Sequence, residues 1–180
     1  PKLAIQAYNY ATKLDPKNPT PYRPKAALFA KSKNWPAAIQ ELSTYVALRT
    51  EDIKARKTLI QYRLNARQYD QAEKELETIL SKNPTDAQGL ILNAILVRMT
   101  GRPARSIAIA TEAIERYPKF AGALSVRARA YVTIGELELA AADLERADEL
   151  SNTPQYAMEL AGLYMRLGRE NDAIALWKSI

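Results

Sequence analysis

A repeat of 34 residues is the feature that most limits what this chain of 180 residues can fold into. Three residues of one stretch return 34 positions later: Ala94, Gly101 and Ala113 return as Ala128, Gly135 and Ala147. Steps of the same length connect Ser106 and Pro118 to residues of similar kind: Ala4, Ala38, Ala72 and Ala140; Pro16 and Pro84. Such a period is typical of stacked helical hairpins, in which each unit buries its apolar face against the next.

The glycine and proline residues in each repeat predict two helices and the point at which each helix ends. Glycine suits the end of the first helix, where a left-handed residue closes the last turn. Proline cannot continue a helix, so Pro16, Pro84 and Pro118 predict the end of the second one. The predicted units are one leading helix over 1–18, full repeats over 19–52, 53–86, 87–120 and 121–153, and a truncated repeat over 154–180. Because both ends expose apolar residues where a polar cap is expected, the sequence predicts a piece of a longer solenoid.

Composition excludes several classes of function. The chain has no cysteine and no histidine, which removes the usual nucleophile, the usual general base and the usual zinc ligands. We therefore expect no enzyme activity, no cofactor and no metal. No apolar run reaches the length of a membrane span. The net charge of +6 is typical of a solvated charged surface, and the alternative is a surface for acidic partners. The lack of cysteine favours a periplasmic over a cytoplasmic location but does not decide the compartment.

The repeat resembles the tetratricopeptide repeat (TPR) family. Residues 121–153 carry the family's small, aromatic and glycine positions at Leu124, Ala128, Tyr131, Gly135, Ala140, Leu144 and Ala147. Units 87–120 and 154–180 carry most of them, whereas 19–52 has no glycine in its turn and 53–86 has Ile60 at a small position. The resemblance implies an all-α, right-handed superhelical solenoid of antiparallel helix pairs. It also implies a non-enzymatic scaffold for protein–protein interaction.

In that family the first helix of each pair lines a concave groove, mainly through repeat positions 2, 5, 9, 12 and 13. Those positions contain seven basic residues and no acidic residue in this chain. The resemblance implies a partner-binding groove at Arg23, Lys54, Lys57, Gln61, Ile91, Ile95, Arg98, Arg129, Met158 and Arg166. Arginine and lysine would hold carboxylates, and the apolar members would contact a peptide's side chains. The alternative for Ile91 and Ile95 is packing against a neighbouring helix.

The predicted partner is another protein with an acidic or peptide-like segment. The alternative is an anionic polymer, either polysaccharide or RNA, although no RNA-repeat code is present and nucleic acid is the less favoured ligand. A likeness in style to bacterial exopolysaccharide-export proteins suggests an envelope assembly. Chaperone-adaptor repeats of the family hold a chaperone's C-terminal carboxylate with a set of Lys, Asn and Arg residues. That set is absent here, since only Lys57 matches one of its positions. The acidic run over 135–150 is interpreted as the outer face of one helix, and a second docking face there stays open.

Overall fold

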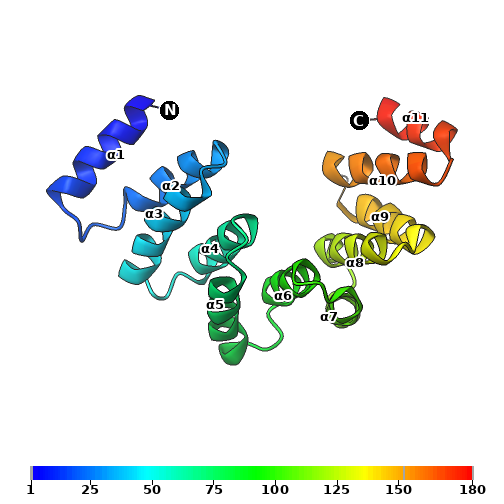
Figure 1. The fold of residues 1–180 in the computed structure, drawn as a ribbon, viewed down its shortest axis with the longest axis horizontal. Coiled ribbons are helices and arrows are strands. Elements are labelled where there is room, and N and C mark those ends of the chain that lie inside the picture. The colour runs from blue at the N-terminus through cyan, green and yellow to red at the C-terminus, as the bar shows by residue number, and fades with distance from the viewer. Residues whose placement is uncertain (1, 152, 180) are drawn as a thin grey trace. The chain divides into compact units, whose positions relative to one another are not determined.

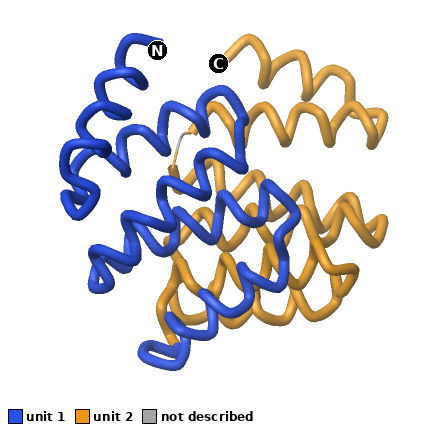
Figure 2. The backbone as a smooth tube through the Cα atoms, turned by 60° about the vertical axis from the view of Figure 1, so that its left-hand side comes forward, with its two compact units in different colours: residues 1–84 blue, residues 85–180 orange. Residues whose placement is uncertain are grey.

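The computed structural model describes residues 2–151 and 153–179, and these residues form eleven α-helices joined by short turns (Figure 1). The chain divides into two compact units, residues 1–84 and residues 85–180 (Figure 2). The helices of unit 1 are α1 (Lys2–Leu14), α2 (Tyr22–Lys31), α3 (Trp35–Leu48), α4 (Ile53–Asn65) and α5 (Tyr69–Lys82). Those of unit 2 are α6 (Ala87–Met99), α7 (Pro103–Arg116), α8 (Ala121–Ile134), α9 (Leu137–Ser151), α10 (Pro154–Arg166) and α11 (Glu170–Lys178).

Within each unit, consecutive helices pack as antiparallel neighbours, which is the predicted all-α, TPR-type solenoid architecture. The prolines act as predicted: α1, α5 and α7 each end two residues before Pro16, Pro84 and Pro118. One helix pair lies inside each of the ranges 19–52, 53–86, 87–120, 121–153 and 154–180. The limits assigned to the single repeats stay a prediction.

The small residues of the repeat lie where helices cross. Ala38, Ala94, Ala113 and Ala128 are completely buried, which lets the facing helices approach closely. Ser106 takes a small position in the series and is also completely buried, and its hydroxyl donates a hydrogen bond of 2.8 Å to the Ala94 carbonyl oxygen. The polar exception in the series is therefore satisfied inside the core.

Apolar side chains fill the space beside these crossings in each unit. In unit 1 the core includes Leu42, Val46 and Leu59 from α3 and α4. In unit 2 one cluster joins α6, α7 and α8 with Ala147 of α9, and a second joins α8, α9, α10 and α11. The first helices of the pairs are thus held firmly on one side, which fixes the positions of the side chains on their other faces.

Side-chain caps set the beginnings of two first helices, α4 and α6, and of one second helix, α3. The Asp52 carboxylate accepts a hydrogen bond from the Ala55 backbone N–H at 2.9 Å at the start of α4. Asp86 does the same for Gly89 at the start of α6. Asn34 caps α3 through the Ala37 N–H. These contacts satisfy donors that the first turn of a helix leaves unpaired.

Candidate functional site

The ten predicted groove residues all lie on first helices of pairs, four in unit 1 and six in unit 2. Unit 1 holds Arg23 on α2 and Lys54, Lys57 and Gln61 on α4. Unit 2 holds Ile91, Ile95 and Arg98 on α6, Arg129 on α8, and Met158 and Arg166 on α10. Each unit thus carries its own part of the predicted surface.

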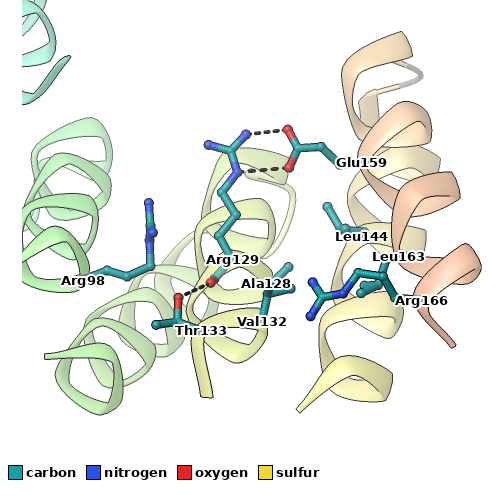
Figure 3. Close-up of a pocket in the computed structure, with 9 residues that line it drawn as sticks. All are labelled: Arg98, Ala128, Arg129, Val132, Thr133, Leu144, Glu159, Leu163 and Arg166. Carbon is teal, nitrogen blue, oxygen red and sulfur yellow. Dashed lines mark hydrogen bonds and ion pairs between the residues drawn. The ribbon is translucent and has the colours of Figure 1, made fainter. Parts of the chain in front are cut away.

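Three of the predicted arginines line one cavity in unit 2. Arg98, Arg129 and Arg166 come from α6, α8 and α10, three successive first helices, and border a hollow of about 320 Å³ (Figure 3). The rest of its lining consists of Ala128, Val132, Thr133, Leu144, Glu159 and Leu163. Cationic edges around an apolar lining can hold an anionic group and the hydrocarbon next to it.

Glu159 is the acidic member of this lining, and it forms a two-pronged ion pair with Arg129. The Nε and Nη2 atoms of Arg129 donate to the two carboxylate oxygens at 3.0 and 2.5 Å, as the dashed lines in Figure 3 show. Gln155, one turn earlier on α10, donates its side-chain N–H to Glu159 Oε1 at 3.0 Å. The pair joins α8 to α10 across the cavity wall.

The pair is a charged one. Burial raises the pKa of Glu159, but the hydrogen bonds from Arg129 and Gln155 and the charge of Arg129 outweigh burial, so its pKa lies below the ordinary value. The hydrogen bond to Glu159 raises the pKa of Arg129 against the opposing effect of burial. At neutral pH the cavity wall therefore carries a carboxylate paired with a guanidinium.

Arg166 differs from Arg129 in having no partner. Its side chain is exposed, and it forms no hydrogen bond or ion pair with another residue in the described part of the chain. Figure 3 shows its guanidinium turned toward Val132. Arg98 is half-buried at the α6 side of the same cavity. The cavity thus combines one arginine held by Glu159 with one that is available to a ligand.

The predicted apolar members lie in different surroundings. Ile91 is buried in the core cluster of α6, α7 and α8, and Ile95 is half-buried against that cluster. Both residues therefore pack against neighbouring helices, as the alternative interpretation of the sequence stated. Met158 is 61% exposed on α10. Because the Ile91 side chain is covered, the apolar surface of the cavity comes instead from residues such as Val132 and Leu163.

In unit 1 the predicted basic residues are more scattered. The Arg23 Nη1 atom lies 3.5 Å from Asp52 Oδ2, and the guanidinium carbon lies 6.0 Å from the centre of the Tyr45 ring. The Tyr45 hydroxyl donates to the same Asp52 oxygen at 2.9 Å. The backbone N–H of Ala55 is the largest of the causes that hold the pKa of Asp52 below its ordinary value. Lys54 is exposed, and Lys57 and Gln61 are half-buried.

The interpretation of the acidic run 135–150 as an outer coating is wrong for Asp143. This carboxylate is only 6% exposed, and it accepts hydrogen bonds from Arg127 Nε and Nη2 at 2.8 and 2.7 Å. Arg127 also donates to the Thr111 hydroxyl at 3.1 Å, so the group connects α7, α8 and α9. The hydrogen bond to Asp143 raises the pKa of Arg127. Among the described residues, no three acidic side chains lie together as metal ligands.

The sequence analysis did not identify Glu159 as a site residue, because Glu159 is not at a groove position of the repeat, although it directly follows one, Met158. It is the sixth residue of its repeat and lies between repeat positions 5 and 9 of the predicted groove. The available signal was the spacing of 30 residues between Arg129 and Glu159, which places opposite charges on facing first helices of adjacent repeats. Only the structure shows that the two side chains meet.

The fold defines a class: repeat proteins built from antiparallel helix pairs that stack through small residues. A family model described as tetratricopeptide repeat matches residues 58–119 and 94–157, which together make up more than half of the chain. The chain belongs to the tetratricopeptide repeat family, whose fold is that of a protein–protein interaction scaffold. None of the helices over the described residues is long and apolar enough to cross a membrane.

Solved structures share this fold at low sequence identity. A TPR protein from Thermus thermophilus is 20% identical with a TM-score of 0.77, covering 90% of this chain and 89% of that one. A TPR protein from Parabacteroides merdae is 22% identical with a TM-score of 0.86, covering 99% and 70%. A human IFIT1 dimer with PPP-AAAA is 17% identical with a TM-score of 0.72, covering 99% and 45%. No curated protein matches the chain.

Proposed function

We propose that this chain is a non-enzymatic scaffold that binds an acidic, peptide-like segment of a partner protein in the cavity of unit 2. The observation that carries the proposal is the convergence of Arg98, Arg129 and Arg166 from three first helices on one hollow with an apolar lining. Arginine's planar fork suits carboxylates, and the apolar lining suits the methylene groups that carry them. In this proposal Met158 extends the contact surface along α10, where its side chain is exposed.

A scaffold role also fits the chemistry that the chain offers. Ion pairs such as Arg127 with Asp143 tie helices of unit 2 together. The exposed cation of Arg166 is the side chain that we assign to the ligand's carboxylate. In unit 1, Arg23, Lys54, Lys57 and Gln61 would form a contact surface of their own for an acidic segment of a partner.

A second candidate ligand is an anionic polymer, favoured by the same three arginines. A bacterial envelope assembly for exopolysaccharide export, with the chain in the periplasm, is a setting in which the cavity would meet such a polymer. The two ligand classes differ in salt dependence, since a polyanion releases many counterions on binding and a short acidic peptide releases few.

The test is fluorescence anisotropy with labelled octapeptides that contain one or two glutamates among apolar residues, beside lysine-containing counterparts. We expect the acidic peptides to bind and Arg166→Glu to weaken binding about tenfold or more, because it replaces an attraction by a repulsion. The matched control is Arg105→Glu, which makes the same charge change at an exposed position on α7 outside the cavity.

Equal losses in Arg166→Glu and Arg105→Glu would show that only net charge matters and would refute the cavity as the site. Titration of heparin and polyuridylate over a range of salt concentrations tests the polymer alternative. A steep loss of affinity with salt, together with no binding of the acidic octapeptides, would replace the protein partner by a polyanion.

A further inference from the structure

The cavity of unit 2 contains its own carboxylate. Glu159 engages Arg129 through both of its oxygens, in the fork geometry that a partner's aspartate or glutamate would use. Gln155 holds one of these oxygens as well. The arginine fork is therefore already filled by a residue of the same chain.

The two sides of the cavity consequently differ in what they can accept. Near Arg166, which has no partner among the described residues, an incoming carboxylate meets an exposed cation. Near Arg129 it meets a guanidinium whose charge is balanced by Glu159 and, beside it, a like charge. A like charge brought next to a carboxylate opposes binding.

The pair is also open enough to be exchanged. The Arg129 and Glu159 side chains are 38% and 27% exposed, and exposed ion pairs contribute little to stability. The backbone under Glu159 is fixed independently, because Leu160, Leu163 and Tyr164 of the same helix are buried in the core. Removing the Glu159 charge should therefore alter the cavity without altering the fold.

We infer that Glu159 is a specificity-determining residue that occupies Arg129 as an internal ligand, so that the cavity accepts a peptide with a single carboxylate and discriminates against consecutive acidic residues. This inference rests on the proposed function. The first carboxylate of the partner contacts Arg166, and a second one next to it would have to displace Glu159. The partner segment is thus an isolated aspartate or glutamate flanked by uncharged residues.

The experiment compares two octapeptides, one with a single glutamate and one with two adjacent glutamates, on the wild type and on Glu159→Gln. Wild type should bind the doubly acidic peptide more weakly than the singly acidic one, because the second carboxylate meets Glu159. Glu159→Gln should bind the doubly acidic peptide about tenfold more tightly, the size of a single favourable charge contact, and the singly acidic one nearly as before. The variant Arg129→Gln/Glu159→Gln should return the affinity for the doubly acidic peptide to the wild-type value.

The matched control is Glu149→Gln, which removes one exposed carboxylate of α9 that does not line the cavity. An equal gain in Glu149→Gln and Glu159→Gln, or no gain in either, would overturn the inference. The singly acidic peptide could bind through Arg166 while Glu159→Gln leaves the relative affinities of the two peptides as they are in the wild type. That result would support the proposed function and refute the role of Glu159. If neither peptide binds any of these proteins, both fall. Far-UV circular dichroism and thermal unfolding verify that every variant is folded.

Discussion

The two units build the same helix pairs with different turn residues. All six glycines of the chain lie in unit 2, and three of them, Gly101, Gly135 and Gly168, end first helices with φ of 83°, 87° and 73°. In unit 1 the equivalent turns have Lys33 and Arg67 at φ of 56° and 59°. The fold thus demands a left-handed residue at this point whether or not the sequence supplies glycine, and unit 1 forms its turns with side chains that disfavour that conformation.

The polar anchors of the two units differ as well. In unit 2, Arg127 grips Asp143 with two hydrogen bonds and Thr111 with a third. In unit 1, Lys25 meets Glu41 with a single contact of 2.7 Å, although this pair is as deeply buried as the Arg127–Asp143 pair. A planar guanidinium fixes direction as well as distance, whereas an ammonium acts as a point charge. The Lys25–Glu41 anchor is therefore less directional than the Arg127–Asp143 anchor, which lies in the unit with the arginine-lined cavity.

The largest effect that we predict concerns these anchors. Asp143→Ala should lower the free energy of unfolding by about 3 kcal/mol, since it leaves a largely buried guanidinium without its counter-charge. Glu41→Ala should cost less, about 1 kcal/mol, because the lysine stem can swing its ammonium toward water. Urea unfolding followed by circular dichroism measures both. Equal costs would remove the distinction that we draw between the anchors of the two units.

The next effect concerns alkaline pH. Burial, together with the hydrogen bond of 2.6 Å to Glu145, raises the pKa of Tyr164 in unit 2 to about 12. Burial also raises the pKa of Tyr62 in unit 1, to a smaller extent. A phenol whose pKa is higher folded than unfolded contributes stability that is complete below pH 10 and is lost as the pH rises toward 12.

Wild type should therefore lose up to about 2 kcal/mol more stability than Tyr164→Phe between pH 9 and pH 12, because each pKa unit corresponds to about 1.4 kcal/mol. Tyr62→Phe should remove a smaller part of the loss. The readout is the change between the two pH values, which cancels the hydrogen bond that Tyr164→Phe removes at every pH. If wild type and Tyr164→Phe lose stability equally, Tyr164 is not the group that titrates.

The fold could be predicted because its determinants repeat. Each small residue, such as Ala94 or Ala128, returns at a fixed interval, and each proline marks a helix end. The candidate site could be predicted only in part. A position list identifies Arg98, Arg129 and Arg166, but it does not show that Ile91 packs inward or that Glu159 reaches Arg129. These outcomes depend on side-chain directions between repeats, which a one-dimensional period does not contain.

The turn residues give the smallest and most direct test of the comparison between units. Lys33→Gly should stabilise unit 1 by about 0.5 kcal/mol. Glycine removes the free-energy cost of the left-handed conformation at this position. Part of that gain is offset because glycine has more conformational freedom in the unfolded chain. Gly135→Ala should destabilise unit 2 by about 1 kcal/mol.

Space plays no part at Gly135, because a Cβ there would meet no atom within 4 Å. The matched control is Gly162→Ala in the middle of α10, where a Cβ is equally unobstructed and φ is not positive. Alanine should there stabilise the helix by about 0.5–1 kcal/mol, since glycine is the poorer helix former. Opposite signs at Gly135 and Gly162 in urea unfolding would show that backbone conformation alone sets the cost. A destabilising Lys33→Gly would mean that unit 1 tolerates its left-handed lysine without strain, and that the two units are equally well adapted to the same turn.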